Sequence, residues 1–100
     1  MNKQRRKALA DLFERLETLK GQAEDIQSEL ETIRDEEQEA FDNLPESLQQ
    51  GERGQASEEA VGEIVDGINE LEEIGTIVEE IGNIVEKIEA AASSVDNASV

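Results

Sequence analysis

A heptad repeat in the first half of the chain constrains its fold more than any other feature. Apolar residues recur there at alternating spacings of three and four, and Glu37 takes one position of the row. This spacing is typical of a coiled-coil seam, in which one stripe of a helix faces a partner helix. It predicts a helix over residues 3–43. The row comprises Leu9, Leu12, Leu16, Leu19, Ala23, Ile26, Leu30, Ile33, Glu37, Ala40 and Leu44.

The middle of the chain predicts a turn over residues 44–56. Pro45 cannot continue the hydrogen-bond ladder of a helix and disfavours helix at Leu44, and Gly51 and Gly54 follow. We expect the apolar residues at the tip to pack on the start of the next helix, and a docking surface is the alternative. That helix is predicted over 57–92, and residues 93–100 are expected to fray. The tip residues are Phe41, Leu44, Pro45 and Leu48.

The second helix has a wider apolar stripe than the first. Its seam begins with Val61, Ile64, Ile68 and Leu71, and the next apolar residue is Ile74, which predicts local overwinding. From there on three positions per heptad are apolar, and one partner helix does not cover so wide a face. We expect this face to associate with a second copy of the chain. It comprises Ile74, Ile77, Val78, Ile81, Ile84, Val85 and Ile88.

Two glycines, Gly75 and Gly82, recur at one heptad position beside this face. They indicate either the close approach of another backbone or glycines tolerated on a surface, and the sequence leaves both interpretations open. Glu37 places a carboxylate at a seam position that is normally apolar. It either pairs with Arg34 or Arg53, or meets water where the seam opens near the tip, and we favour water.

These elements predict an all-α fold in a single domain. Two helices of similar length joined by a short connection fold back on each other, so we expect an antiparallel two-helix hairpin of the coiled-coil type. With Phe13 and Phe41 as the two aromatic residues, the chain lacks the large side chains that usually fill a compact core. We therefore expect the hairpin to associate into a dimeric or larger helical bundle.

The charge is large and unevenly distributed. The formal net charge is −17, yet residues 1–20 contain six basic residues and three acidic ones. The acidic body should repel nucleic acid and anionic membranes. The chain contains no apolar run long enough for a membrane span and no apolar segment after its basic start, so we expect a cytoplasmic protein. The basic cluster, a candidate anion-binding site, comprises Lys3, Arg5, Arg6 and Lys7.

The residue types argue against an enzyme and against a cofactor. The chain has no Cys and no His, which removes thiol nucleophiles, the commonest general base and the histidine ligands of a ferritin-like di-iron site.

The carboxylates Asp35, Glu36 and Glu39, followed by Glu63 and Asp66, have spacings similar to the E-E-x-x-E and E-x-x-D patterns of MazG-like nucleotide pyrophosphohydrolases. That family binds Mg²⁺ through carboxylates. Asp35 departs from the first Glu of that pattern, and 26 acidic residues produce such spacings by chance. A solvated acidic face is the favoured interpretation. Apart from Asp35, the candidate Mg²⁺ ligands are Glu36, Glu39, Glu63 and Asp66.

The stretch around the turn resembles a known group of proteins. The segments DEEQEAFDNLPESLQ at 35–49 and GERGQASEEA at 51–60 resemble small helical proteins of bacteriophages and prophages to which no activity is assigned. The resemblance implies a phage or mobile-element setting and no mechanism.

The sequence thus favours a non-enzymatic, acidic interaction protein. The expected partners are a second copy and a host protein with a basic surface, which the chain would bind and inhibit. DNA mimicry is one version of this inhibition, and solubility explains the acidity equally well. One alternative is an oligomeric sponge that holds a small nucleotide at the N-terminal basic cluster. The other is the Mg²⁺-dependent pyrophosphohydrolase.

Overall fold

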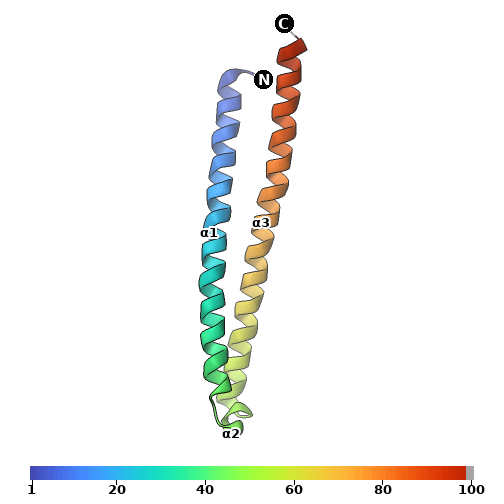
Figure 1. Ribbon diagram of the computed structural model, residues 1–100. Coiled ribbons are helices and arrows are strands. Elements are labelled where there is room, and N and C mark those ends of the chain that lie inside the picture. The colour runs from blue at the N-terminus through green and yellow to red at the C-terminus, as the bar shows by residue number, and fades with distance from the viewer. Residues whose placement is uncertain (99–100) are drawn as a thin grey trace.

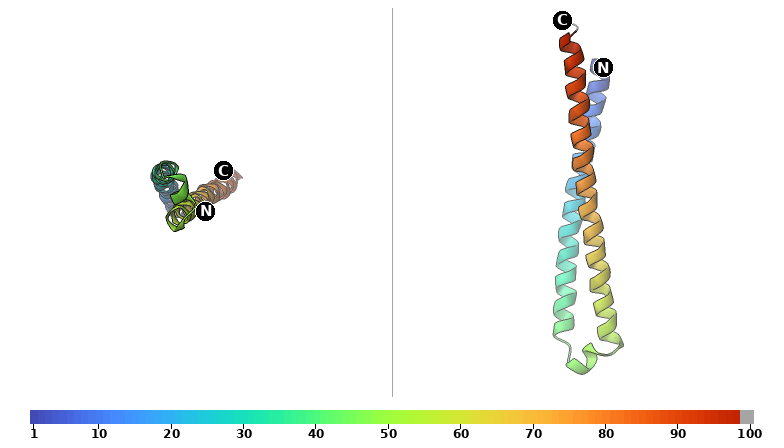
Figure 2. Two further views of the ribbon diagram at one scale, coloured as in Figure 1. Left: turned by 90° about the horizontal axis from the view of Figure 1, so that it is seen from below. Right: turned by 90° about the vertical axis from the view of Figure 1, so that its right-hand side faces the viewer.

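The computed structural model describes residues 1–98, and its side chains are described through residue 92. The fold is all-α, as predicted, and the described residues form no strand. The helices are α1 (Lys3–Asp42), α2 (Glu46–Gln49) and α3 (Glu52–Ala98). The molecule is a rod of 78 × 15 × 14 Å in which α1 and α3 lie side by side and run in opposite directions (Figures 1 and 2). No described helix has the length and hydropathy of a membrane span.

Helix α1 begins and ends where local chemistry favours it. The side chain of Asn2 accepts a hydrogen bond of 2.8 Å from the backbone N–H of Arg5, which satisfies one of the unpaired donors of the first turn. At the other end, the N–H of Asn43 donates to the carbonyl of Glu39 at 3.0 Å. The helix stops ahead of Pro45, within one residue of the predicted boundary.

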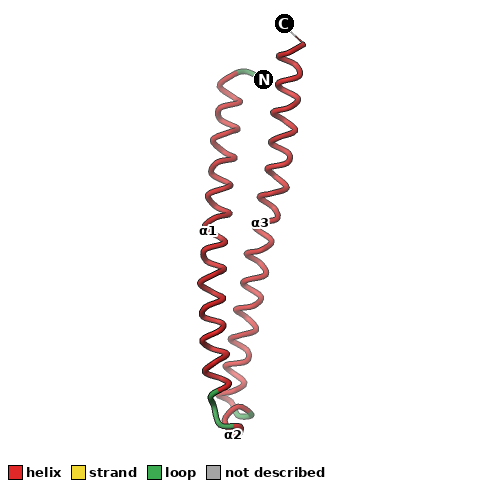
Figure 3. Tube along the Cα trace, viewed as in Figure 1, coloured by secondary structure: helices red, strands yellow, loops and turns green. Residues whose placement is uncertain are grey.

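The turn at the tip is shorter than predicted, because α3 begins at Glu52 instead of residue 57 (Figure 3). The side-chain amide of Gln49 donates to the carbonyl of Phe41 at 3.1 Å and so ties α2 to the end of α1. Gly54 is buried in the first turn of α3, and a Cβ there would overlap the backbone of Gln49. This close approach of α2 and α3 lets the helix start early. Leu48 and Pro45 stay exposed, whereas Phe41 and Leu44 are half-buried.

Helix α3 also continues further than predicted. It runs through Ala98, so residues 93–98 are helical where fraying was expected, and the rest of that prediction, residues 99–100, lies outside the described residues. The segment contains no Pro or Gly. Extending an existing helix adds one hydrogen bond for each residue fixed, which favours continuation once the helix has formed.

The contact between α1 and α3 uses a different row of α1 from the predicted one. The prediction is wrong for Leu12, Leu19, Ile26 and Ile33, which are 48–52% exposed. In their place, the residues that follow them by one position turn towards α3. The contact row is Leu9, Phe13, Leu16, Lys20, Ala23, Gln27, Leu30, Arg34, Glu37, Phe41 and Leu44, all buried or half-buried.

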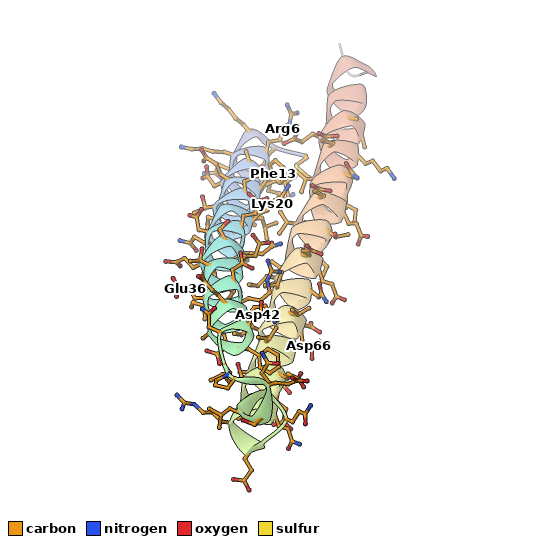
Figure 4. All side chains as sticks on the ribbon, turned by 60° about the horizontal axis from the view of Figure 1, so that its bottom comes forward. Arg6, Phe13, Lys20, Glu36, Asp42 and Asp66 are labelled. Carbon is orange, nitrogen blue, oxygen red and sulfur yellow. The ribbon has the colours of Figure 1, made fainter. Side chains whose placement is uncertain are left out.

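The glycines of α3 explain this rotation. The ring of Phe13 lies over Gly82, where a Cβ would come within 2.8 Å of its Cε2, and the side chain of Lys20 passes Gly75. Figure 4 shows Phe13 and Lys20 on the side of α1 that is turned towards α3. Gly82 thus admits the ring of Phe13, whereas a Cβ at Gly75 would make only an ordinary van der Waals contact with Lys20. The seam of α3 passes from Leu71 through Gly75 to the buried Val78, so its heptad continues without the predicted overwinding.

Candidate interaction face

Apart from Met1 and Leu48 near the two ends of the rod, the large apolar residues that the helix pair leaves uncovered form two rows. In α1 they stand seven residues apart and are half-exposed. In α3, Ile77 and Ile84 are 52% and 55% exposed, and the half-buried Ile74, Ile81 and Ile88 lie beside them. We refer to these rows together as the apolar face, which comprises Leu12, Leu19, Ile26 and Ile33 of α1 and Ile74, Ile77, Ile81, Ile84 and Ile88 of α3.

The heptad places both rows on one side of the helix pair. If the contact positions are labelled a and d, then Leu12 and its equivalents occupy position g of α1, and Ile74 and its equivalents occupy position g of α3. In an antiparallel pair, the two g positions flank the same side of the contact and the two e positions flank the other, as the symmetry of the pair requires. The apolar face is therefore continuous across both helices.

The opposite side of the contact is polar. The ammonium of Lys20 donates to Oε1 of Glu79 at 2.8 Å, and the amide of Gln27 donates to Oε1 of Glu72 at 3.1 Å. Both glutamates occupy position e of α3. The hydrogen bond from Lys20 and its positive charge lower the pKa of Glu79, and the same hydrogen bond raises the pKa of Lys20. The side of the contact formed by the g positions is therefore apolar, whereas the side formed by the e positions is polar and charged.

A shallow open groove runs along the α1 part of the apolar face. Leu12, Leu16 and Leu19 line it, with Arg15 and Gln22 among the polar residues around them. Apolar side chains flanked by polar ones are the arrangement found where a second helix docks, because the centre loses water and the rim keeps it.

Two residues of the predicted self-association face lie elsewhere. Val78 and Val85 are 2% and 7% exposed, because they occupy position d of α3 and pack inside the helix pair. The remaining five residues belong to the apolar face. The exposed row of α1 was not predicted to be part of it, because the heptad placed that row in the contact with α3. A sequence signal existed: Phe13 and Phe41 stand in the row that follows by one residue.

Glu37 pairs with neither Arg34 nor Arg53, and the favoured expectation that it meets water is wrong, because it is half-buried in the contact. Its Oε1 accepts a hydrogen bond of 2.7 Å from the hydroxyl of Ser57, which is 8% exposed. Ser57 lies inside α3, not at its start, and so meets α1 across the contact. Arg34 instead donates to Asp35 at 3.1 Å. The pair formed by Glu37 and Ser57 is a polar layer in the contact near the tip.

The other predicted sites show no assembled geometry. The four candidate metal ligands Glu36, Glu39, Glu63 and Asp66 are all exposed, and Glu36 lies on the outer side of α1, away from α3 (Figure 4). The described residues contain no group of three acidic side chains placed to hold a metal ion. In the basic cluster, Lys3, Arg5 and Lys7 are exposed, and Arg6 is half-buried and donates to the carbonyl of Met1 at 3.3 Å.

Comparison with known proteins adds no relative to this description. No family model matches the chain, and no curated protein or solved structure is similar enough to match it.

Proposed function

We propose that this chain is a non-enzymatic, acidic helical hairpin that works as an interaction protein and buries its apolar face against another protein chain. The observation that carries the proposal is the row of four Leu and Ile side chains on α1, each about half exposed, at a strict spacing of seven residues. Single apolar side chains scattered over a surface are common and need no explanation. A row of them at a fixed spacing does need one.

The repeat also matches what helices with two neighbours need. A helix that contacts one partner needs two apolar positions per heptad, whereas a helix inside a bundle uses a third, at e or g. Both α1 and α3 carry the third position, and both carry it at g. One neighbour of each helix is present within the chain, and the apolar face is the place for another.

The acidic exterior narrows the kind of partner. With 26 acidic and nine basic residues, the surface as a whole repels nucleic acid and anionic lipid and favours a protein chain with compensating charge or an apolar surface of its own. Binding to a basic host protein, and the phage setting implied by the residues of the turn, stay predictions.

Carbene footprinting tests the proposal. A photoactivated diazirine labels exposed C–H bonds, and labelling is compared between purified protein at low concentration, purified protein at high concentration and protein in an extract of its native cells. We expect Leu12, Leu19 and Ile26 to be protected in at least one of the concentrated conditions, whereas the exposed Leu48 at the tip stays labelled. If the face remains as reactive as Leu48 throughout, it is not an interaction face.

A further inference from the structure

We infer that the occupant of the apolar face is a second copy of this chain, bound about a two-fold axis that runs along the helices, so that both tips lie at the same end. The inference rests on the proposed function and specifies its partner. The resulting assembly is a four-helix bundle in which α1 of each copy packs against α3 of the other.

The two rows of the face overlap in height. The contacts of Phe13 with Gly82 and of Lys20 with Glu79 set the register of the pair. In this register, in which Phe13 is level with Gly82 and Lys20 with Gly75, Leu12 and Leu19 lie level with the stretch from Ile84 to Ile74, and Ile26 lies about one helical turn beyond it. A two-fold axis along the helices preserves height, so each copy's α1 row meets the partner's α3 row over its apolar part.

The opposite orientation fits less well. If the two-fold axis ran across the helices, the tips would point in opposite directions and α3 would pack against the partner's α3. With the two rods overlapping over their full length, Ile81, Ile84 and Ile88 would then lie opposite the stretch that contains Glu63 and Glu70. Burying apolar side chains against carboxylates leaves the carboxylates without water or a partner, which is costly.

The area of the face is sufficient for a dimer. Six Leu and Ile side chains are about half exposed and three more are partly exposed. Covering them buries roughly 600–700 Å² per copy, close to the roughly 800 Å² per partner of a standard protein interface.

Charge supports the same orientation at the open end of the rod. Residues 1–20 have six basic side chains against three acidic ones, although the whole chain has a charge of −17. The part of α3 at this height carries the acidic residues Glu79, Glu80, Glu86 and Glu89 and the basic residue Lys87. In the proposed bundle, the basic start of each α1 lies at the height of this acidic stretch of the partner's α3, which offsets part of the repulsion between two acidic chains.

The solution mass and one matched pair of variants test the choice of partner. By light scattering, we expect the wild-type protein to have twice the 11.0 kDa mass of one chain. Leu19→Glu places a carboxylate in the face and should weaken dimerisation at least about 100-fold. Ala10→Glu adds the same charge at an exposed position on the other flank of α1 and should leave the mass unchanged.

A distance measurement tests the orientation without disturbing the face. The chain has no native Cys, so Ser47→Cys, exposed at the tip, carries one spin label per copy. Because packed helices lie about 8–10 Å apart, labels on adjacent tips should be roughly 20–40 Å apart in the dimer. Opposed tips would give a distance near the 78 Å length of the rod.

The outcomes separate this inference from the proposed function. A dimer with the short distance supports it, and a dimer with the long distance overturns the orientation. A folded wild-type monomer at all concentrations overturns the second copy as the occupant. The proposed function then survives only if footprinting shows protection of the face in the cell extract, and it fails if the face is labelled there too.

Discussion

At the scale of single residues, glycines decide how closely the helices approach. Gly82 and Gly54 are both buried, but they face different neighbours: the aromatic ring of Phe13 in one case and the backbone of Gln49 in the other. A side-chain ring can shift when a methyl group is added, whereas a backbone carbonyl held in a turn cannot. Gly62, in contrast, has no atom within 4 Å of an added Cβ.

Two alanine substitutions should therefore have opposite effects. Gly62→Ala should increase the free energy of unfolding by about 1 kcal/mol, because glycine is a poor helix former. Gly54→Ala should reduce it by about 1–3 kcal/mol, because the new methyl group overlaps the Gln49 backbone. Urea denaturation followed by circular dichroism measures both, and Gly21→Ala, also in open space, is a second control that should stabilise. Stabilisation by Gly54→Ala would contradict the packing of the tip.

The ion pair of Lys20 and Glu79 makes a pH-dependent contribution to stability. The lowered pKa of Glu79 means that the folded state holds its carboxylate ionised to lower pH than the unfolded state, with an ordinary value of 4.5. That contribution is present above this value and is lost as the pH falls through the lowered pKa. The raised pKa of Lys20 adds a contribution that is present below 10.5 and is lost as the pH rises through the raised value.

We expect Lys20→Met to return the pKa of Glu79 to its ordinary range, because the hydrogen bond that lowers it is gone. An NMR titration of the Glu79 side-chain carboxyl carbon measures this pKa. Arg34→Met, whose guanidinium pairs with Asp35 on the same helix, is the control and should leave the pKa of Glu79 where it is. An unchanged pKa in Lys20→Met would show that the cross-helix pair does not form.

At the scale of the helices, the contact between α1 and α3 combines apolar layers with polar ones. Ala23, Ile68, Val78 and Val85 are among its buried apolar residues. Near the tip, one layer of the contact is polar and consists of Ser57 and Glu37, joined by a hydrogen bond. A buried polar pair tolerates fewer registers than an apolar layer, because a shift leaves its members without partners.

Breaking this pair should cost more than replacing it. Ser57→Ala should lower the free energy of unfolding by about 1 kcal/mol, because the half-buried carboxylate of Glu37 loses its donor. The double variant Ser57→Ala, Glu37→Leu should be at least as stable as the wild type, because both polar groups are removed together. Thermal unfolding of the two variants checks the difference. A double variant less stable than Ser57→Ala alone would mean that Glu37 is better placed in water.

At the scale of the whole molecule, a rod only about two helices wide buries few side chains completely. Among the described side chains, five apolar residues are 2–7% exposed, and three of those are Val or Ile. Such a structure gains little from its own core, so association through the apolar face should supply much of its stability. Binding between folded chains stabilises them by mass action.

The midpoint of thermal unfolding should therefore rise with protein concentration for the wild type. For Leu19→Glu it should be lower and independent of concentration, because the dimer no longer forms. Circular dichroism at 222 nm over a hundredfold range of concentration measures both. A midpoint independent of concentration in the wild type would mean that the chain is stable alone, which contradicts the second-copy partner.

Much of this arrangement follows from local sequence. The spacing of apolar residues predicted the all-α fold, Pro45 placed the end of α1, and the third apolar position in each heptad of α3 pointed to a face that one helix does not cover. These features depend on residues a few positions apart, so helix geometry alone decides them. The contribution of Leu12, Leu19, Ile26 and Ile33 to that face was not predicted.

Tertiary packing decided the rotation of α1 about its own axis. The residues Leu9, Leu16, Ala23 and Leu30 belong to two possible contact rows, one completed by Leu12 and its equivalents and the other by Phe13 and its equivalents. Periodicity is equal in both rows and cannot choose between them. The choice depends on a separate helix, α3, where Gly82 admits the ring of Phe13 and Ser57 meets Glu37. Because of that fit, the row formed by Leu12 and its equivalents turns outwards and lies on the surface of the helix pair.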